Sequence, residues 1–310
     1  MTVLSFVILG CSGKEVVSSS EAAQPILQEV LTSNYDDEIV PIGDIDTHPL
    51  IQSYFGWYTH LLSPSGEPVM ILAQSEVSRA HIMHVRNHLA FGLVEPSSSG
   101  LFDFDGVFNE MANNKASILM FEGPAQETAA ISDGLLDLDW QVEALLLEDT
   151  VLPGSSAWLN NDHIDLSLST VYSLLFQTGW NAVDTSLQNE MIDQSNSAID
   201  GGVWQPVQSE QESGSVQSRV AAYFSQLVSI DFGHWQHTDE PWDGEWTLNS
   251  RSAISDSHPD GFGLIRSLVP EYYTPEVILD SELAQSITML YDSGRPESAK
   301  SQYWLSLIHI

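Results

Sequence analysis

The pattern of hydrophobic positions changes along the chain, from short apolar runs in the first half to long helical repeats in the second. Residues 67–74 and 115–121 are short runs with continuously apolar centres, which is typical of buried β-strands. Between them, residues 78–94 repeat apolar side chains at helical spacing, and residues 107–114 show a second helical pattern. This order predicts a strand, helix, helix, strand unit near the N-terminus.

The second half of the chain has a mainly helical pattern from about residue 153 onward. Helical repeats occur at residues 165–178, 183–199, 214–230, 261–268 and 281–291, and loops rich in glycine and tryptophan separate some of them. We therefore expect an α+β fold, with a small N-terminal layer of strands and helices over residues 47–152 and a mainly helical part over residues 153–304.

The N-terminal residues are typical of an export signal. Residues 1–10 carry no charged side chain and consist mostly of apolar residues, yet they are too few to span a bilayer, which takes roughly 20 apolar residues. The run Ile8-Leu9-Gly10-Cys11 resembles the bacterial lipobox, in which the cysteine is lipidated and becomes the new N-terminus. The resemblance implies an exported protein of the cell envelope, lipid-anchored at Cys11 and periplasmic or surface-facing. The alternative is a buried thiol in a first strand.

Two further segments lie outside the expected folded body. Residues 12–46 begin with a Ser-rich stretch, which indicates a tether, and continue with a short helix interrupted by Pro25. The last six residues, LSLIHI, are what a common transposon-derived sequencing adapter encodes in this frame. We therefore expect residues 305–310 to be foreign to the natural protein, and His309 takes no part in the candidate sites.

The charge balance excludes several partners. Asp and Glu number 43 against 9 Lys and Arg, which gives a formal net charge of -34. Nucleic acid requires many basic residues for its phosphates, so a nucleic-acid partner is excluded. Adsorption to anionic lipid is equally unfavourable, and the membrane would be a partner only through the lipid anchor at Cys11. We interpret the acidity as adaptation to a salty medium, with attraction of cationic ligands as the alternative.

Three histidines in the helical segment at residues 78–94 are candidates for metal binding. His81, His84 and His88 stand at offsets of three and four, which places them on one helical face. Histidines at i and i+4 can share a zinc ion. No carboxylate in this segment completes the set, and Arg86 and Asn87 indicate that part of the helix faces water. Solvated histidines are therefore the alternative.

The loop at residues 233–246 (GHWQHTDEPWDGEW) combines histidines, carboxylates and tryptophans. Such a loop could ligate a metal ion, bind a sugar by stacking, or simply cover the core of a helical domain. The metal candidates are His234, His237, Asp239 and Glu240, and the stacking candidates are Trp235, Trp242 and Trp246.

A short acidic turn at residues 102–106 has the opening of a calcium-binding loop. The EF-hand pattern requires a third oxygen ligand and a Glu at the end of the loop. Here Asp105-Gly106 is followed by Val107 and Phe108 instead. We therefore predict a turn before a helix.

The order of several short segments resembles a group of bacterial, largely marine, secreted proteins with a zincin-like metallopeptidase core. The matching stretches are residues 47–49, 69–73, 84, 89–90, 116–120, 179–180, 223–224, 245–248 and 272–275. Each stretch is short, and the resemblance rests on their order. It implies that the mainly helical part of the fold is zincin-like.

In that group, a helix carrying HExxH precedes a Gly-aromatic pair, and a later helix supplies a Glu just before a Tyr-Phe pair. Aligned by those pairs, this chain has degenerate metal-site positions, namely Ser169, Thr170, Ser173 and Ala222. No HExxH, nucleophile elbow, phosphate-binding glycine loop or dinucleotide fingerprint occurs in the chain. The resemblance therefore implies a catalytically inactive protein, without a cofactor, that binds a peptide or protein.

Two alternatives to an inactive scaffold stay open. The first is an active metal-dependent hydrolase that uses the loop at His234 and His237, with zinc as its cofactor. The second is a carbohydrate-binding envelope protein, for which the tryptophan-rich loops are the only support.

Overall fold

The computed structural model describes residues 39–42, 48–93, 103–152, 155, 164–206, 215–235 and 241–269. Several expected features lie outside these residues: the lipidation site Cys11, residues 12–38, the last predicted helix at residues 281–291 and residues 305–310. The loop candidates His237, Asp239 and Glu240 also lie outside them. These features stay predictions.

Five strands form one mixed sheet in the order β1-β2-β3-β4-β5. They are β1 (Val40–Pro41), β2 (Trp57–Leu62), β3 (Pro68–Ala73), β4 (Ala116–Phe121) and β5 (Gln141–Leu146). β1, β2 and β3 pair antiparallel, whereas β3, β4 and β5 pair in parallel. The strands predicted at residues 67–74 and 115–121 are confirmed as β3 and β4.

The hydrophobic pattern predicts these two strands because both of their faces are buried. Ile71 and Ile118 face the larger core cluster, whereas Leu72 and Leu119 face a smaller cluster on the other side of the sheet. A strand buried on both faces is apolar almost without interruption. The pattern does not predict β5, because this strand lies at an edge and mixes Gln, Glu and Ala with its apolar residues.

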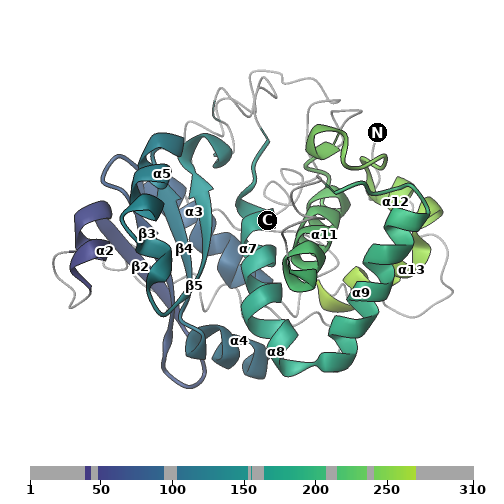
Figure 1. The fold of residues 1–310 in the computed structure, drawn as a ribbon, viewed down its shortest axis with the longest axis horizontal. Coiled ribbons are helices and arrows are strands. Elements are labelled where there is room, and N and C mark those ends of the chain that lie inside the picture. Colours follow the sequence, from purple (N-terminus) through teal and green to yellow (C-terminus); the bar gives the residue numbers. More distant parts are fainter. Residues whose placement is uncertain are drawn as a thin grey trace, which may run out of the picture.

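Helices cover both faces of the sheet (Figure 1). The connection from β3 to β4 contains α3 (Arg79–Gly92) and α4 (Phe104–Asn113), which pack on the face of the larger core cluster. The opposite face is covered by α5 (Pro124–Ser132) and by the short α2 (Pro49–Tyr54). The two helices predicted between β3 and β4 are thus confirmed.

Local capping explains where α3 and α4 begin. Ser78 caps α3, and its Oγ accepts a hydrogen bond from the backbone N–H of His81 at 3.4 Å. Asp103 caps α4 in the same way and accepts from the backbone N–H of Gly106 at 2.8 Å. The acidic turn is therefore a helix N-cap, which confirms the predicted turn before a helix.

The second half of the described chain is mainly helical, as predicted. In chain order its elements are α7 (Ser167–Leu175), the π-helical turn Phe176–Trp180, α8 (Asn181–Val183), α9 (Thr185–Asp200), α11 (Val216–Asp231), α12 (Arg251–Ser257) and α13 (Pro259–Leu268). α7 lies between the sheet and α11 and packs against both (Figure 1).

Gly179 permits the close contact between the π-helical turn and α4. A Cβ atom at this position would lie 2.7 Å from Val107 Cγ1 and 3.1 Å from the Val107 carbonyl oxygen. Trp180, the next residue, is buried in the core, where its ring meets that of Phe104 at a centroid distance of 6.1 Å. The turn is therefore packed tightly between α4 and the core.

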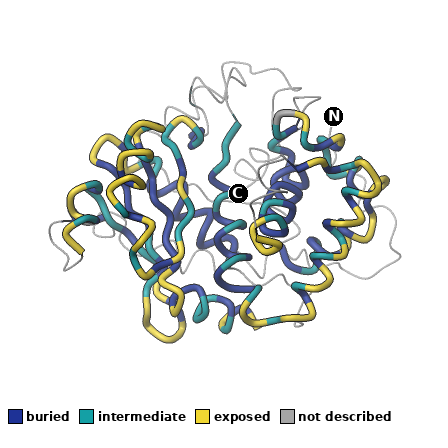
Figure 2. Tube along the Cα trace, in the orientation of Figure 1, coloured by how far each residue is buried: buried dark blue, intermediate teal, exposed yellow. Residues whose placement is uncertain are grey.

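The larger hydrophobic core cluster runs through both halves of the described chain (Figure 2). It joins Ile71 and Ile118 of the sheet to Leu89 of α3 and Phe224 of α11. The result is a mixed α/β fold, so the expected α+β arrangement is confirmed at that level. Among the described helices, none is both long and apolar enough to cross a membrane.

Candidate metal centre

α3 carries His84 and His88 one helical turn apart, on the face that packs into the protein. Both residues are buried, with exposed fractions of 1% and 0%. Their Nε2 atoms lie 3.0 Å apart, and the rings meet edge to face with centroids 4.3 Å apart. Two ring nitrogens thus point at one another inside the core.

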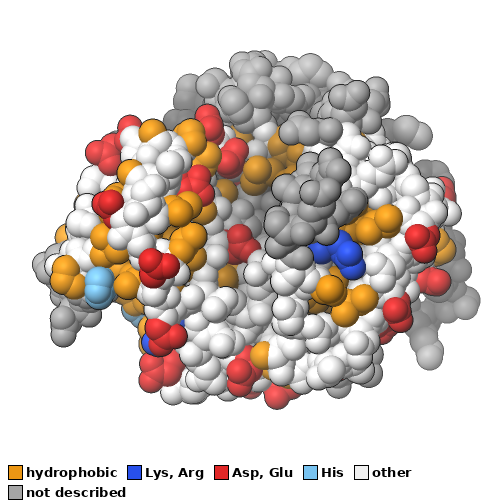
Figure 3. Space-filling model, viewed as in Figure 1, with side chains coloured by type: hydrophobic (Ala, Val, Ile, Leu, Met, Phe, Trp, Pro, Cys, Tyr) orange, Lys and Arg blue, Asp and Glu red, His pale blue; other side chains and the backbone are white. Residues whose placement is uncertain are grey.

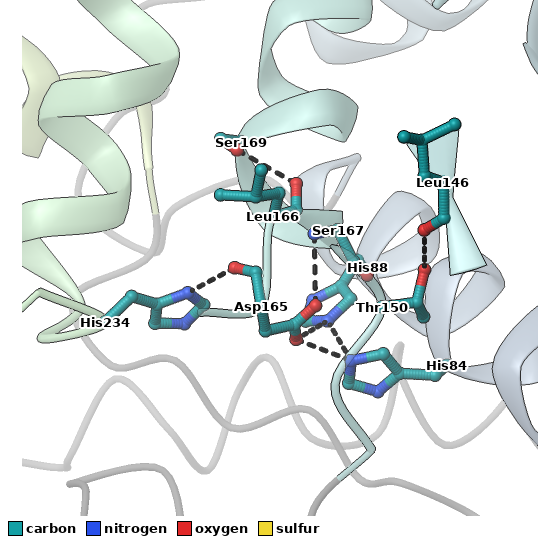
Figure 4. Close-up of polar contacts among 9 residues, drawn as sticks. All are labelled: His84, His88, Leu146, Thr150, Asp165, Leu166, Ser167, Ser169 and His234. Carbon is teal, nitrogen blue, oxygen red and sulfur yellow. Dashed lines mark hydrogen bonds and ion pairs between the residues drawn. The ribbon is translucent and has the colours of Figure 1, made fainter. Parts of the chain in front are cut away.

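Asp165, just before the first turn of α7, brings a carboxylate to the same place (Figure 4). Its Oδ2 atom lies 2.7 Å from His84 Nε2 and 3.5 Å from His88 Nε2. Its Oδ1 atom accepts a hydrogen bond from the backbone N–H of Ser167 at 3.1 Å, which fixes the carboxylate at the start of the helix. The three potential ligand atoms all lie within 4.8 Å of one another.

Taken together, His84 Nε2, His88 Nε2 and Asp165 Oδ2 have more lone pairs than hydrogens. A neutral imidazole carries one N–H, and an ionised carboxylate only accepts. If His84 Nε2 donates to Asp165, the lone pair of His88 Nε2 faces that same N–H, and a second hydrogen would clash across the 3.0 Å gap between the nitrogens. One hydrogen on His84 Nε2 would have to be shared between two acceptors, whereas a metal ion would take an electron pair from each of the three atoms.

The separations between the three atoms also fit a tetrahedral metal ion. Zinc binds imidazole nitrogen and carboxylate oxygen at about 2.0–2.2 Å, which places neighbouring ligand atoms roughly 3.3–3.5 Å apart. The observed distances are 2.7, 3.0 and 3.5 Å. Side-chain shifts of less than about 1 Å would therefore complete the coordination geometry.

The protonation states of His88 and Asp165 suit metal ligands, which have to be deprotonated. Burial foremost, and then the neighbouring His84, lower the pKa of His88 to about 3, so its imidazole is neutral at physiological pH. Burial alone would raise the pKa of Asp165, but the charge and hydrogen bonds of His84 and His88 outweigh burial and hold that pKa well below its ordinary value. Asp165 is therefore ionised.

His234 lies behind Asp165 and contacts its main chain (Figure 4). It follows Gly233, whose φ of 83° turns the chain at the end of α11. The Nδ1 atom of His234 lies 3.2 Å from the main-chain oxygen of Asp165 and has to be the donor, because a carbonyl only accepts. Burial is the main cause that lowers the pKa of His234. His234 thus positions Asp165 from the helical half, while its own nitrogens lie outside the group of three ligand atoms.

His81 lies on the same helix but does not join the centre. Its Nδ1 atom forms a hydrogen bond with Ser78 Oγ at 2.7 Å, and its side chain is part-exposed at the start of α3. Burial, followed by the neighbouring His84, lowers the pKa of His81 to about 4. The predicted face of three histidines therefore separates into a buried pair and one outer histidine.

The structure shows that this part of α3 does not face water, and it supplies the carboxylate that the helix itself lacks. Arg86 and Asn87, which the sequence suggested as signs of a face in water, are buried with exposed fractions of 4% and 1%. The solvated-histidine alternative is therefore wrong for His84 and His88. The carboxylate that the local sequence lacks comes from Asp165, 81 residues after His84, because α7 packs against α3.

The tryptophans of the loop at residues 233–246 belong largely to the core. Trp235 and Trp246 are buried with exposed fractions of 7% and 1%. Trp235 Nε1 donates to Ser229 Oγ at 3.1 Å, and Trp246 Nε1 donates to Gln226 Oε1 at 2.7 Å. Trp242 is half-buried, and its ring packs on that of Trp235 with centroids 4.6 Å apart. The rings of Trp235 and Trp246 therefore pack inside the protein rather than face a sugar.

The positions that the resemblance assigns to a lost metal site lie on α7 and α11, two helices that pack together. Ser169 Oγ donates to a main-chain oxygen three residues earlier at 2.9 Å, whereas Ser173 Oγ donates to Glu143 of β5 at 2.7 Å. Thr170 is part-exposed, and Ala222 on α11 packs against the larger core cluster. These side chains serve local hydrogen bonding and packing.

Comparison with protein families, curated proteins and solved structures finds no match to this chain. The candidate centre is therefore assigned from its own geometry, with His84, His88 and Asp165 as potential ligands and His234 as the residue that positions Asp165.

Proposed function

We propose that this protein binds one divalent metal ion of the zinc class through His84, His88 and Asp165. The observation that carries the proposal is the convergence of two buried imidazole nitrogens and one carboxylate oxygen, at 2.7, 3.0 and 3.5 Å from one another. Burying such polar groups is unfavourable unless they are paired, and one metal ion pairs all three.

The ligand set selects the class of metal. Imidazole suits zinc and the neighbouring transition metals, whereas calcium and magnesium prefer oxygen ligands. Three protein ligands leave the fourth position for water, as in catalytic rather than structural zinc sites. Ferrous iron is also bound by two histidines and one carboxylate, so the binding test includes it.

A water molecule at the fourth position would give the centre hydrolytic chemistry. Zinc lowers the pKa of its bound water to about 7, so hydroxide is available at neutral pH. We therefore keep the metal-dependent hydrolase as the activity that this centre would support. Its ligands would be His84, His88 and Asp165 instead of the loop residues at 237–240.

The test is metal binding by the purified chain. Calorimetric titration with Zn²⁺ and Fe²⁺ gives the affinity, and elemental analysis gives the number of ions per chain. We expect one ion per chain in the wild type, and an affinity lower by about tenfold or more in His88→Gln. His81→Gln is the matched control, because it removes a histidine of the same helix that lies outside the centre.

The possible results separate the candidate sites. Weaker binding in His88→Gln but not in His81→Gln supports the centre. Equal loss in both variants, or no bound metal in the wild type, overturns it. Loss of binding in His237→Ala together with full binding in His88→Gln would assign the metal to the loop instead.

We further propose, from the resemblance, that the helical half is a zincin-like scaffold with an inactive peptidase site, in a protein anchored through Cys11. The packing of α7 on α11, together with Ser169, Ser173 and Ala222 at the aligned positions, supports the first part. Peptide cleavage that survives in His88→Gln would contradict an inactive zincin site. A Cys11→Ser chain that stays in the membrane fraction would contradict the anchor.

A further inference from the structure

A second polar cluster joins β5 to α7, and none of its residues belongs to the metal centre. Glu143 extends from β5 toward α7, where Ser173 Oγ donates to its Oε1 atom at 2.7 Å. Gln177 Nε2 donates to the same Oε1 atom at 2.5 Å and to Ser173 Oγ at 3.0 Å. Two neighbouring side chains therefore share one oxygen of the Glu143 carboxylate.

The hydrogen bonds within this cluster converge on one carboxylate oxygen and leave other acceptors over. Ser173 has one hydroxyl hydrogen, which goes to Glu143, and Gln177 Nε2 lies within hydrogen-bond distance of both Glu143 Oε1 and Ser173 Oγ. The hydrogen bonds among the described residues involve Glu143 Oε1 and Gln177 Nε2 and leave Glu143 Oε2 and Gln177 Oε1 over, and both residues are only part-buried. The cluster thus presents two oxygen acceptors to an incoming group.

The negative charge of Glu143 is not compensated by the described residues. The ion pairs between those residues join other carboxylates to Lys, Arg or His. Burial raises the pKa of the Glu143 carboxyl, and the hydrogen bonds from Ser173 and Gln177 oppose this only in part. A cation brought by a ligand would stabilise the ionised form.

The cluster is reached from the edge of the sheet. Within the described strands, β5 pairs only with β4, and Gln141, which lies on the same face of β5 as Glu143, is exposed. On α7 and the turn that follows it, Ser173 and Gln177 are part-exposed. The space-filling view is hollowed in the region where Figure 1 places β5 and α7, and an acidic side chain shows in the hollow (Figure 3).

Gln177 is presented by an unusual piece of backbone, the π-helical turn Phe176–Trp180. Such turns are rare in proteins and occur frequently at functional sites. On its other side the turn is held against α4 by the contact of Gly179 with Val107. The amide of Gln177 therefore stands on a rigid support.

We propose that Glu143, Ser173 and Gln177 bind the primary ammonium group of a ligand. An ammonium head carries a positive charge and three N–H donors, which match Glu143 Oε2 and Gln177 Oε1. A guanidinium group fits less well, because its two-pronged pairing needs both carboxylate oxygens and Oε1 already accepts two hydrogen bonds. Calcium requires six to eight oxygen ligands, more than the cluster has left.

Two sources supply this chemistry, a small free amine and the lysine side chain of a peptide. The experiment uses one probe for each: n-butylamine, and lysine capped as its N-acetyl methylamide. Capped norleucine is the control ligand, because it keeps an alkyl side chain and lacks the charge.

The full chain is titrated with each probe by calorimetry at neutral pH, as wild type and as the variants Glu143→Gln and Glu148→Gln. Gln at position 143 retains an oxygen that accepts from Ser173 and Gln177, so the variant loses the charge and keeps the hydrogen bonds. Glu148 is exposed in the turn after β5 and is the control for the loss of one negative charge.

We expect both amines to bind saturably to the wild type and to Glu148→Gln. Their affinity for Glu143→Gln should be lower by about tenfold or more, and capped norleucine should not bind. Equal affinity of the two amines identifies the ammonium group alone as the ligand, and tighter binding of capped lysine identifies a peptide. Absence of saturable amine binding, or undiminished binding to Glu143→Gln, overturns the proposal, as does Ca²⁺ binding that Glu143→Gln abolishes. His88→Gln should bind the amines like the wild type, which keeps this test independent of the metal centre.

Discussion

The Nε2 atoms of His84 and His88 face each other at 3.0 Å inside the protein, and a carboxylate oxygen of Asp165 lies 2.7 Å from the first of them. The three atoms belong to α3 and to the start of α7, which meet only in the folded chain. A metal ion bound here therefore binds the folded state and not the unfolded one, which couples metal binding to stability.

Zinc should accordingly raise the thermal stability of the wild-type chain. A ligand that binds only the folded state stabilises it by about 2.7 kcal/mol at roughly 100 times its Kd. Thermal unfolding followed by circular dichroism, with zinc and with a chelator, measures this difference. The shift should vanish in His88→Gln and persist in His81→Gln. The same shift in both variants would place the zinc elsewhere.

Asp165→Asn separates the charge of the carboxylate from its shape. The asparagine keeps an oxygen for the N–H of Ser167 and gains an amide donor toward His84, so the metal-free stability should stay within about 1 kcal/mol of the wild type. Zinc affinity should fall about 10- to 100-fold. Urea unfolding and calorimetry give the two quantities. Unchanged zinc affinity would remove Asp165 from the ligand set.

His234 is predicted to act through Asp165 rather than on the metal itself. His234→Ala removes the N–H that donates to the main chain of Asp165 and should weaken zinc binding about tenfold. His234→Asn places a donor near the position of Nδ1 and should recover most of the zinc affinity. His234→Gln should not recover it. If Asn binds zinc as poorly as Ala does, the hydrogen bond is not the reason why His234 matters.

The fold could be predicted from the sequence where the pattern is local. β3 and β4 are apolar apart from Ser117 because helices cover both faces of the sheet, and Ser78 marks the start of α3 as an N-cap. β5 is not predicted in this way because Gln141 and Glu143 interrupt its apolar pattern, and the role of Glu143 depends on α7. Edge strands of this kind are defined by their neighbours more than by their own composition.

The metal centre could be predicted only in part, for the same reason. His84 and His88 stand at i and i+4, so helical geometry alone brings them together. Asp165 lies 81 residues after His84 in the chain and is brought to it by the packing of α7 on α3, which no local spacing reveals. His81 has an equivalent spacing but lies on the outer turn, and only the position of the core distinguishes it from the buried pair.

Glu143 should make the stability of the chain fall as pH rises. Its pKa is raised above the ordinary value of 4.5, so the folded state holds the proton more tightly than the unfolded state does. This contribution is fully present below the unfolded pKa and is lost as pH rises through the folded pKa. Glu143→Gln should therefore gain stability relative to the wild type as pH rises from about pH 4. Urea unfolding over this range measures the difference, and Glu148→Gln should follow the wild type.

Gly179→Ala should destabilise the chain by about 1–3 kcal/mol. The new methyl group would lie 2.7 Å from Val107 Cγ1 and 3.1 Å from the Val107 carbonyl oxygen, and the latter moves only if α4 moves. Gly263→Ala in α13 is the matched control, because no atom beyond its chain neighbours and its own helix backbone lies within 4 Å of the added Cβ, so it should be neutral or slightly stabilising. Urea unfolding compares the two variants. Equal stability would show that the π-helical turn adapts to the methyl group and does not hold Gln177 on a rigid support.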